Sequence, residues 1–314
     1  MLPFRPVAWI THPSSLKHDM GKGHPECPQR LQAIDDRLRM GGLLDFMLQV
    51  QAPPASLEQL LRVHDRAHIE RILQADASHG PVWQDPDTAQ GPHTSEAALH
   101  AAGAGVKAVD MVLAEQAGMA FCAVRPPGHH AERSCAMGFC FFNNIAVAAA
   151  HALSGGLKRI AILDFGLHYG NGTANIFAGD ERVRLYSTYQ HPLYPYWESR
   201  ADIDNLVDVA LPPGAGSREF RAAVSAHWLG SMMEQKPQMI LVSAGFDAHA
   251  EDPLGDLRLG YDDYSWIAAQ IQRVAEDCCP GRVVAMLEGG YSLHALARCT
   301  ERFLQPFLTG DMIL

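Results

Sequence analysis

The strongest constraint on the fold is a set of four short apolar segments that each end in polar residues. The segments cover residues 119–124, 159–165, 238–244 and 282–287. Apolar runs of this length, bounded by turn or polar residues, are typical of strands buried on both faces of a parallel sheet. Apolar residues recur with helical spacing at 95–117, 144–153, 218–234 and 261–278. This alternation predicts an α/β fold with a parallel sheet covered by helices on both faces.

Four clusters of chemically capable side chains follow these strands. In a parallel sheet the carboxyl ends of the strands lie at one edge, where ligands bind. We therefore expect the clusters to meet there. They are RPPGHH at 125–130, DFGLH at 164–168, SAGFD at 243–247 and EGGY at 288–291. Histidines, carboxylates and a tyrosine are the groups needed for metal-assisted hydrolysis.

Asp164, Gly166 and His168 are spaced two residues apart. Positions with this spacing share a face of a strand, so the three are expected to line up. Hydrolytic zinc sites typically take three protein ligands from His, Asp and Glu and leave a position for water. His168 and Asp247 are candidate ligands, with a structural role as the alternative. A third ligand is expected at Gly166, which has no side chain.

His129 and His130 follow a Pro-Pro-Gly turn, and a loop can direct both imidazoles into one pocket. One could act as the general base and the other as the general acid for a leaving amine. Tyr291 follows a glycine turn, and its hydroxyl could donate a hydrogen bond to an oxyanion. The alternatives are a pair of polar loop histidines and a core tyrosine.

The composition excludes several classes of partner. The chain has 314 residues without an evident linker, so we expect a single domain over 1–314. The net charge of −10 without a basic block argues against a nucleic-acid binder. No apolar stretch is long enough to span a membrane. Seven cysteines without a CxxC pair argue against a disulfide framework or thiolate zinc site, and favour a cytoplasmic location.

These strings together resemble the histone deacetylase superfamily. The nearest subgroup resembles the bacterial class II deacetylase-like amidohydrolases, relatives of the acetylpolyamine amidohydrolases. The resemblance runs from about residue 10 to about residue 300. It also includes HPECPQRL at 24–31, GFCFFNN at 138–144, DFGLHYGNGT at 164–173, LPPGAG at 211–216 and SAGFDAH at 243–249.

The resemblance implies an arginase/deacetylase-like three-layer αβα fold with a central, mainly parallel, eight-stranded sheet. It implies hydrolysis of a small-molecule or peptide N-acyl amine, such as acetyl-lysine or an acetylated polyamine. It also implies one Zn²⁺ ion per chain, a structural K⁺ ion that Asp164 would help to bind, and a homodimer or homotetramer.

The resemblance further implies a role for each motif residue. His168 and Asp247 match two zinc ligands. The residues that match catalytic groups are His129 and His130 as base and acid, Asp164 and Asn171 as their orienting partners, and Tyr291 as the transition-state stabiliser. The residues that match the substrate channel are Gly138, Phe139, Tyr194 and Leu254. Leu254 stands at a gate where some polyamine-selective relatives have glutamate, which favours acyl-lysine.

The sequence departs from the family pattern Asp-x-Asp-x-His-His, because residues 164–169 read DFGLHY. Gly166 stands where the family has an aspartate ligand. Loss of a ligand should cost more metal affinity than the 10–100-fold typical of outer-sphere changes. Water, a ligand carboxylate, Glu251 or Asp252 could fill the gap.

Two interpretations of this chain stay open. It is a zinc-dependent deacetylase with an impaired metal site, or a weak or inactive pseudo-deacetylase that binds acyl-amines or peptides. Whether Gly166 is natural or engineered is also open. A third possibility, amidine hydrolysis, lacks the carboxylates of a two-metal site.

Overall fold

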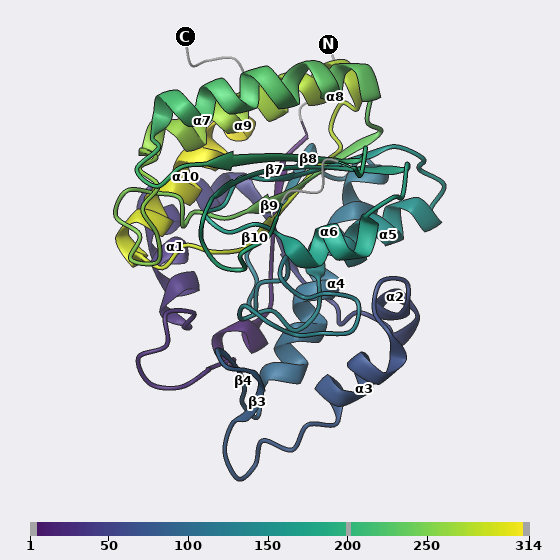
Figure 1. The fold of residues 1–314 in the computed structure, drawn as a ribbon, viewed down its shortest axis with the longest axis vertical. Helices are drawn as coiled ribbons and strands as arrows, with labels where there is room; N and C mark the ends of the chain where they lie inside the picture. The colour runs from purple at the N-terminus through teal and green to yellow at the C-terminus, as the bar shows by residue number, and fades with distance from the viewer. Residues whose placement is uncertain (1–4, 199–201, 310–314) are drawn as a thin grey trace.

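The computed structural model describes residues 5–198 and 202–309, which form helices around an eight-stranded sheet (Figure 1). The strand order is β2-β1-β5-β10-β9-β6-β7-β8, and every neighbouring pair is parallel. The strands are β1 (Val7–Thr11), β2 (Met47–Gln51), β5 (Met119–Cys122), β6 (Ile160–Asp164), β7 (Val183–Gln190), β8 (Leu206–Leu211), β9 (Met239–Ala244) and β10 (Val283–Leu287).

The four predicted strands are confirmed as β5, β6, β9 and β10, which are the central strands of the sheet. Successive residues of these strands point to opposite faces. In β6, Ile160 and Ile162 join the hydrophobic cluster on one face, and Ala161 and Leu163 join the cluster on the other. Both faces are buried, which explains why these strands are apolar without alternation.

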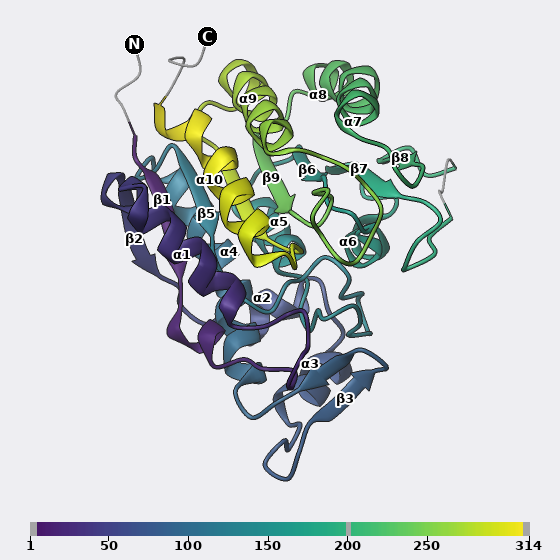
Figure 2. The same cartoon turned by 90° about the vertical axis from the view of Figure 1, so that its left-hand side faces the viewer.

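Helices cover both faces of the sheet, as the two views show (Figures 1 and 2). One face carries α4 (Thr94–Leu113), α5 (Asn144–Ser154) and α6 (Asn171–Phe177), and short α2 (Leu57–Leu61) and α3 (Arg66–Leu73) lie on this side. The other face carries α1 (Gln29–Met40), α7 (Ser217–Val224), α8 (Gly230–Gln235), α9 (Tyr261–Cys278) and α10 (Leu293–Thr309). The three-layer αβα fold expected from the resemblance is therefore confirmed, with a fully parallel sheet.

Smaller elements complete the described chain. The short helical segments are η1 (Pro13–Leu16), η2 (Leu43–Phe46) and the π-helical turn η3 (Ser225–Leu229), and β3 (Val82–Asp85) and β4 (Thr88–Gln90) form an antiparallel hairpin. The helix predicted at 218–234 is divided into α7, η3 and α8. All seven cysteines are free thiols. Within residues 5–198 and 202–309, no helix is long and apolar enough to cross a membrane.

The register of the strands brings the polar clusters together. Asp164 at the end of β6 pairs with Ser243 of β9, and Ala244 of β9 pairs with Leu287 of β10. Neighbouring β5 ends at Cys122, opposite Met286. The loops that follow β5, β6, β9 and β10 therefore leave the sheet at one level of its carboxyl edge.

Candidate active site

His168 and Asp247, the two candidate metal ligands, lie in direct contact at the carboxyl edge. Nδ1 of His168 is 3.1 Å from Oδ2 of Asp247. The other carboxylate oxygen, Oδ1, accepts a hydrogen bond from the backbone N–H of Leu167 at 2.8 Å. Burial opposes ionisation of Asp247, but His168 outweighs it and lowers the pKa of the carboxyl. The pair therefore presents an imidazole nitrogen and an ionised carboxylate at one point.

The position expected to supply a third ligand lies beside this pair. A Cβ atom placed on Gly166 would lie 3.1 Å from Oδ1 of Asp247 and 3.7 Å from Oδ1 of Asp164. The Cβ of a side chain at this position would thus lie between the two carboxylates, once Asp247 had shifted slightly to relieve the 3.1 Å contact. Among the residues that the structure describes, no third His, Cys, Asp or Glu brings a ligand atom to the His168–Asp247 pair. The donor types fit a zinc ion, but the chain supplies two ligands rather than three.

Glu251 and Asp252 do not fill this gap, because both carboxylates are engaged elsewhere. Glu251 accepts a hydrogen bond from the hydroxyl of Tyr261 at 2.9 Å. Asp252 accepts one from the backbone N–H of Leu254 at 3.1 Å and one from the backbone N–H of Tyr291 at 2.6 Å. Asp252 therefore holds the backbone at Tyr291 in place.

Hydrogen bonds fix the tautomer of His130. The side-chain NH₂ of Asn171 donates to the carboxylate of Glu132 at 2.8 Å, so its amide oxygen faces His130. Nδ1 of His130, 2.8 Å from that oxygen, must carry a proton, which leaves the lone pair on Nε2. Burial, together with His129 and His168, keeps the pKa of His130 well below its usual value. His130 is thus a neutral imidazole able to accept a proton.

The neighbouring His129 is held in the opposite charge state. Its Nδ1 lies 2.9 Å from Oδ2 of Asp164, and the two histidine rings are 4.1 Å apart. Burial opposes protonation, but Asp164 and Glu288 outweigh it and raise the pKa of His129 to about 9. Glu288 also accepts backbone hydrogen bonds from Gly128 at 2.7 Å and His129 at 3.1 Å. The loop that carries both histidines is therefore anchored to the end of β10.

The Gly289-Gly290 turn presents Tyr291 to the site. A Cβ on Gly289 would lie 2.0 Å from Oδ2 of Asp247, and Gly290 has a φ of 124°. Only glycine allows this close approach and this backbone conformation. Burial raises the pKa of Tyr291 well above its usual value. Its hydroxyl therefore stays protonated and can donate.

The predicted channel residues surround these groups. The ring of Tyr194 lies 5.3 Å from that of His130 and 6.2 Å from that of His168, and the ring of Phe139 lies 5.9 Å from that of Tyr291. These centroid distances place both predicted wall residues next to predicted catalytic residues.

Gly138 and Leu254 occupy positions beside the site. Gly138 has a φ of 56°, and a Cβ there would lie 2.5 Å from the His130 ring. Leu254 is half-buried, and its neighbour Gly255 lies against Leu167. All the predicted site residues thus lie in one region, while Gly166 contributes only backbone.

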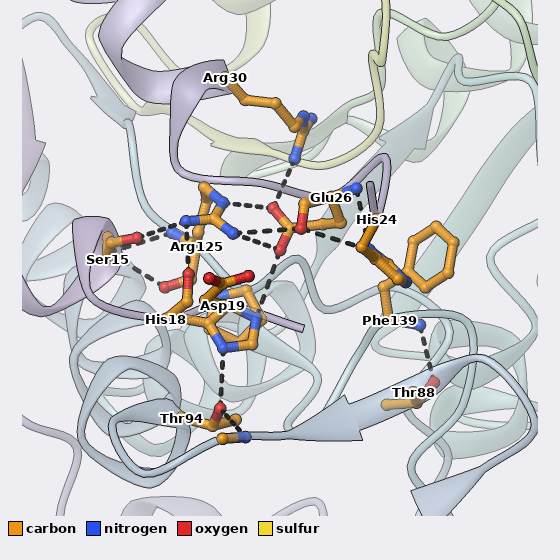
Figure 3. A network of polar contacts seen from close by, with 12 residues as sticks. Ser15, His18, Asp19, His24, Glu26, Arg30, Thr88, Thr94, Arg125 and Phe139 are labelled. Atoms are coloured by element: carbon orange, nitrogen blue, oxygen red, sulfur yellow. Dashed lines mark hydrogen bonds and ion pairs between the residues drawn. The ribbon is translucent and has the colours of Figure 1, made fainter. Parts of the chain in front are cut away.

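A network of buried charged residues lies next to the candidate active site (Figure 3). Glu26, Arg30, Arg125 and His18 are fully buried. Both guanidinium groups bind the Glu26 carboxylate, Arg30 at 3.0 Å to Oε1 and Arg125 at 2.7 Å to Oε2. His18 lies 3.3 Å from the same carboxylate. One carboxylate thus pairs with two buried guanidinium groups.

This network reaches the candidate active site through Arg30. Arg30 donates to the backbone carbonyls of Glu288 at 2.5 Å and Gly290 at 2.7 Å. Its guanidinium carbon also lies 4.9 Å from the centre of the Tyr291 ring. Arg30 therefore positions the turn that presents Tyr291.

Sequence reasoning assigned no role to the supporting residues. Glu26, Arg30, Arg125 and Glu288 lie within the motif strings quoted above, which was the only available signal. Glu132 lies outside every quoted string. Apart from the Glu26–Arg30 pair, their partners come from distant segments, so the sequence alone does not show that these charges are buried together.

Replacing Glu26 by alanine is expected to lower the free energy of unfolding by about 3–5 kcal/mol, because two buried guanidinium groups lose their counter-charge. Urea unfolding would measure the change. Asp35→Ala is the control, since Asp35 pairs with Arg39 in the exposed part of α1 and its loss should leave the midpoint nearly unchanged. Equal midpoint shifts in the two variants would contradict a stabilising role for the network.

Comparisons with known proteins agree with this geometry. Residues 24–306 match the model of the histone deacetylase domain. The chain is 38% identical to a "Probable deacetylase" of Archaeoglobus fulgidus over 309 residues, covering 96% of this chain and 86% of the relative. It is 37% identical to a "Histone deacetylase-like amidohydrolase" of Pseudomonas aeruginosa, covering 90% of this chain and 75% of the relative. The crystal structure of the HDA15 HD domain superposes with a TM-score of 0.90 at 28% identity, covering 97% and 90% of the two chains.

Proposed function

Because this chain belongs to the histone deacetylase family, we propose that it hydrolyses N-acyl amides such as acetyl-lysine in a peptide. The observation that carries the proposal is the fixed lone pair on Nε2 of His130, next to the His168–Asp247 pair. A proton acceptor beside a site for a Lewis-acidic ion is the arrangement that amide hydrolysis requires.

We propose that His168 and Asp247 hold one zinc-type ion with lower affinity than a site with three protein ligands. Such an ion, when bound, would supply Lewis acidity for the acyl carbonyl and lower the pKa of water. Both protein donors lie on loops at the carboxyl edge of the sheet. Water or a substrate group would take the place of the third ligand beside Gly166.

His130 is proposed to move the proton during the reaction. Its Nε2 accepts a proton from the attacking water as the water oxygen bonds to the acyl carbon. The same nitrogen then returns the proton to the amine nitrogen as the C–N bond breaks, giving a carboxylic acid and an amine. The sequence-based assignment made His129 the base, whereas the raised pKa of His129 supports giving this role to His130.

His129 and Tyr291 are proposed to stabilise the charge that develops on the acyl oxygen. His129, protonated and paired with Asp164, supplies a fixed positive charge. Tyr291 supplies a neutral O–H donor. Preorganised donors of this kind are worth about 10²–10³-fold each in turnover.

We place the acyl-amine chain beside Phe139 and Tyr194, whose rings border Tyr291 and His130. The half-buried Leu254 offers no charge to a polyamine, which supports acyl-lysine as the substrate class.

A second candidate function is a pseudo-deacetylase that binds acyl-amines without turnover. The observation that favours it is the two-ligand metal site.

The test is hydrolysis of an acetyl-lysine amide by the purified chain, with and without a chelator and after zinc is restored. We expect slow turnover that the chelator abolishes and zinc recovers. Binding of the amide that survives chelation, with no turnover at any zinc concentration, would instead support the pseudo-deacetylase.

A further inference from the structure

The predicted channel wall residue Phe139 lies in a strained turn. Met137 and Cys140 exchange two backbone hydrogen bonds, at 3.1 and 3.0 Å, which close a tight turn around the two residues between them. Both of these residues have a positive φ, 56° at Gly138 and 68° at Phe139. Positive φ at both central positions is the condition of a type I′ turn, which favours Gly, Asn and Asp there. A bulky side chain in this conformation is strained, so other groups must hold it.

Thr88 holds the backbone of this turn. The turn itself uses the N–H groups of Met137 and Cys140, which leaves the N–H of Phe139 for another partner. Oγ1 of Thr88 accepts this N–H at 2.9 Å and donates its own proton to Oδ1 of Asp87 at 3.0 Å. Thr88 is fully buried in the β3–β4 hairpin. A buried hydroxyl that both accepts and donates is fixed in place, and so is the backbone it holds.

His24 holds the ring of the same wall residue (Figure 3). The ring centres of His24 and Phe139 are 4.6 Å apart, and their planes meet at 78°. Nδ1 of His24 accepts the backbone N–H of Glu26 at 3.1 Å, so Nε2 carries the proton and faces the backbone carbonyl of Asp87 at 3.3 Å. The His24 ring is thus tied to the hairpin that carries Thr88.

We propose that Thr88 is a positioning residue that keeps Phe139 against the alkyl chain of an acyl-lysine, a ligand class that rests on the proposed function. In the position that Thr88 fixes, the ring of Phe139 lies 5.9 Å from that of Tyr291, with the planes at 84°. A wall that is ordered before the ligand arrives loses little conformational freedom on binding. Thr88 therefore raises the affinity for the ligand without touching it.

Thr88→Val tests this role, since valine keeps the shape of threonine but can neither accept the N–H of Phe139 nor donate to Asp87. At saturating Zn²⁺ we expect KM for an acetyl-lysine amide to rise by about 3–10-fold, as for the loss of one hydrogen bond, with kcat nearly unchanged. Thr88→Ser keeps the hydroxyl and should restore KM. The matched control is Thr300→Val, which removes a buried hydroxyl that donates to the carbonyl of Leu296 in α10 and should leave KM unchanged.

Hydrogen exchange at the Phe139 amide gives a readout that does not depend on turnover. This amide should exchange about tenfold faster or more in Thr88→Val than in the unaltered chain, Thr88→Ser or Thr300→Val. Unchanged exchange in Thr88→Val, or a KM that rises equally in Thr88→Val and Thr300→Val, would overturn the role of Thr88. A chain without turnover would contradict the proposed function instead, and the dissociation constant of the amide, measured by calorimetry, would then replace KM in the same comparison.

Discussion

Replacing His130 by alanine is expected to lower the turnover of an acetyl-lysine amide by about 10²–10⁴-fold, the usual contribution of a general acid–base group. In the proposed reaction Nε2 of His130 both removes the proton from water and delivers it to the amine. No other neutral imidazole with a fixed Nδ1 proton takes part in it. The measurement is kcat and KM for the variant and the unaltered chain at saturating zinc.

Two companion variants make this result interpretable. Tyr291→Phe keeps the ring that packs on Phe139 and Arg30 but removes the hydroxyl, so it should fold normally and lose about 10²–10³-fold in kcat. Asn171→Ala keeps His130 but removes the amide oxygen that holds its proton on Nδ1, so both neutral tautomers become accessible. The fall in kcat should therefore be smaller than in His130→Ala. Near-normal turnover in both His130→Ala and Tyr291→Phe, with folding verified by melting temperature, would exclude these residues from the chemistry.

Replacing Gly166 by aspartate is expected to raise zinc affinity by more than about 100-fold. A residue that binds the metal directly should change the affinity more than the 10–100-fold typical of residues that only contact the ligands. Residue 166 is well placed to carry this ligand. A Cβ added there would lie 3.1 Å from Oδ1 of Asp247, and the same carboxylate contacts His168. We expect turnover at limiting zinc to rise with the affinity. Competition with a chelator of known strength measures the affinity, and the amide assay measures the turnover.

The metal-free form of Gly166→Asp should be less stable than the unaltered chain. The new carboxylate would join Asp164 and Asp247 in a buried region, and like charges at this distance repel. Zinc should reverse the loss. Gly166→Ala and Gly166→Asn are the matched controls, since the first adds only the Cβ and the second adds a neutral side chain of similar shape. If Gly166→Asp bound zinc no more tightly than Gly166→Ala, position 166 would not face the metal.

The sequence predicted the centre of the fold better than its edges. Strands β5, β6, β9 and β10 are buried on both faces, so their apolar runs stand out from the surrounding chain. Strand β2 lies at an edge with three of its five residues exposed, and β8 at the other edge is mostly half-buried and has one aspartate among five apolar residues. Neither gives the continuous apolar run by which the central strands were predicted. These outer strands entered the expectation only through the family resemblance.

The sequence by itself determined which chemical groups stand at the strand ends, and that the position two residues before His168 has no side chain. Both follow from the spacing of residues along the chain, because residues two apart in a strand point to the same face of the sheet. Only the tertiary structure decided the protonation of His129 and His130, because Asp164, Asn171 and Glu288 come from other segments. It also showed that Glu251 and Asp252 are engaged elsewhere, and that Thr88 meets Phe139 across 51 residues of chain. Charge state and ligand geometry depend on distances between remote side chains, and the packing of the folded chain sets those distances.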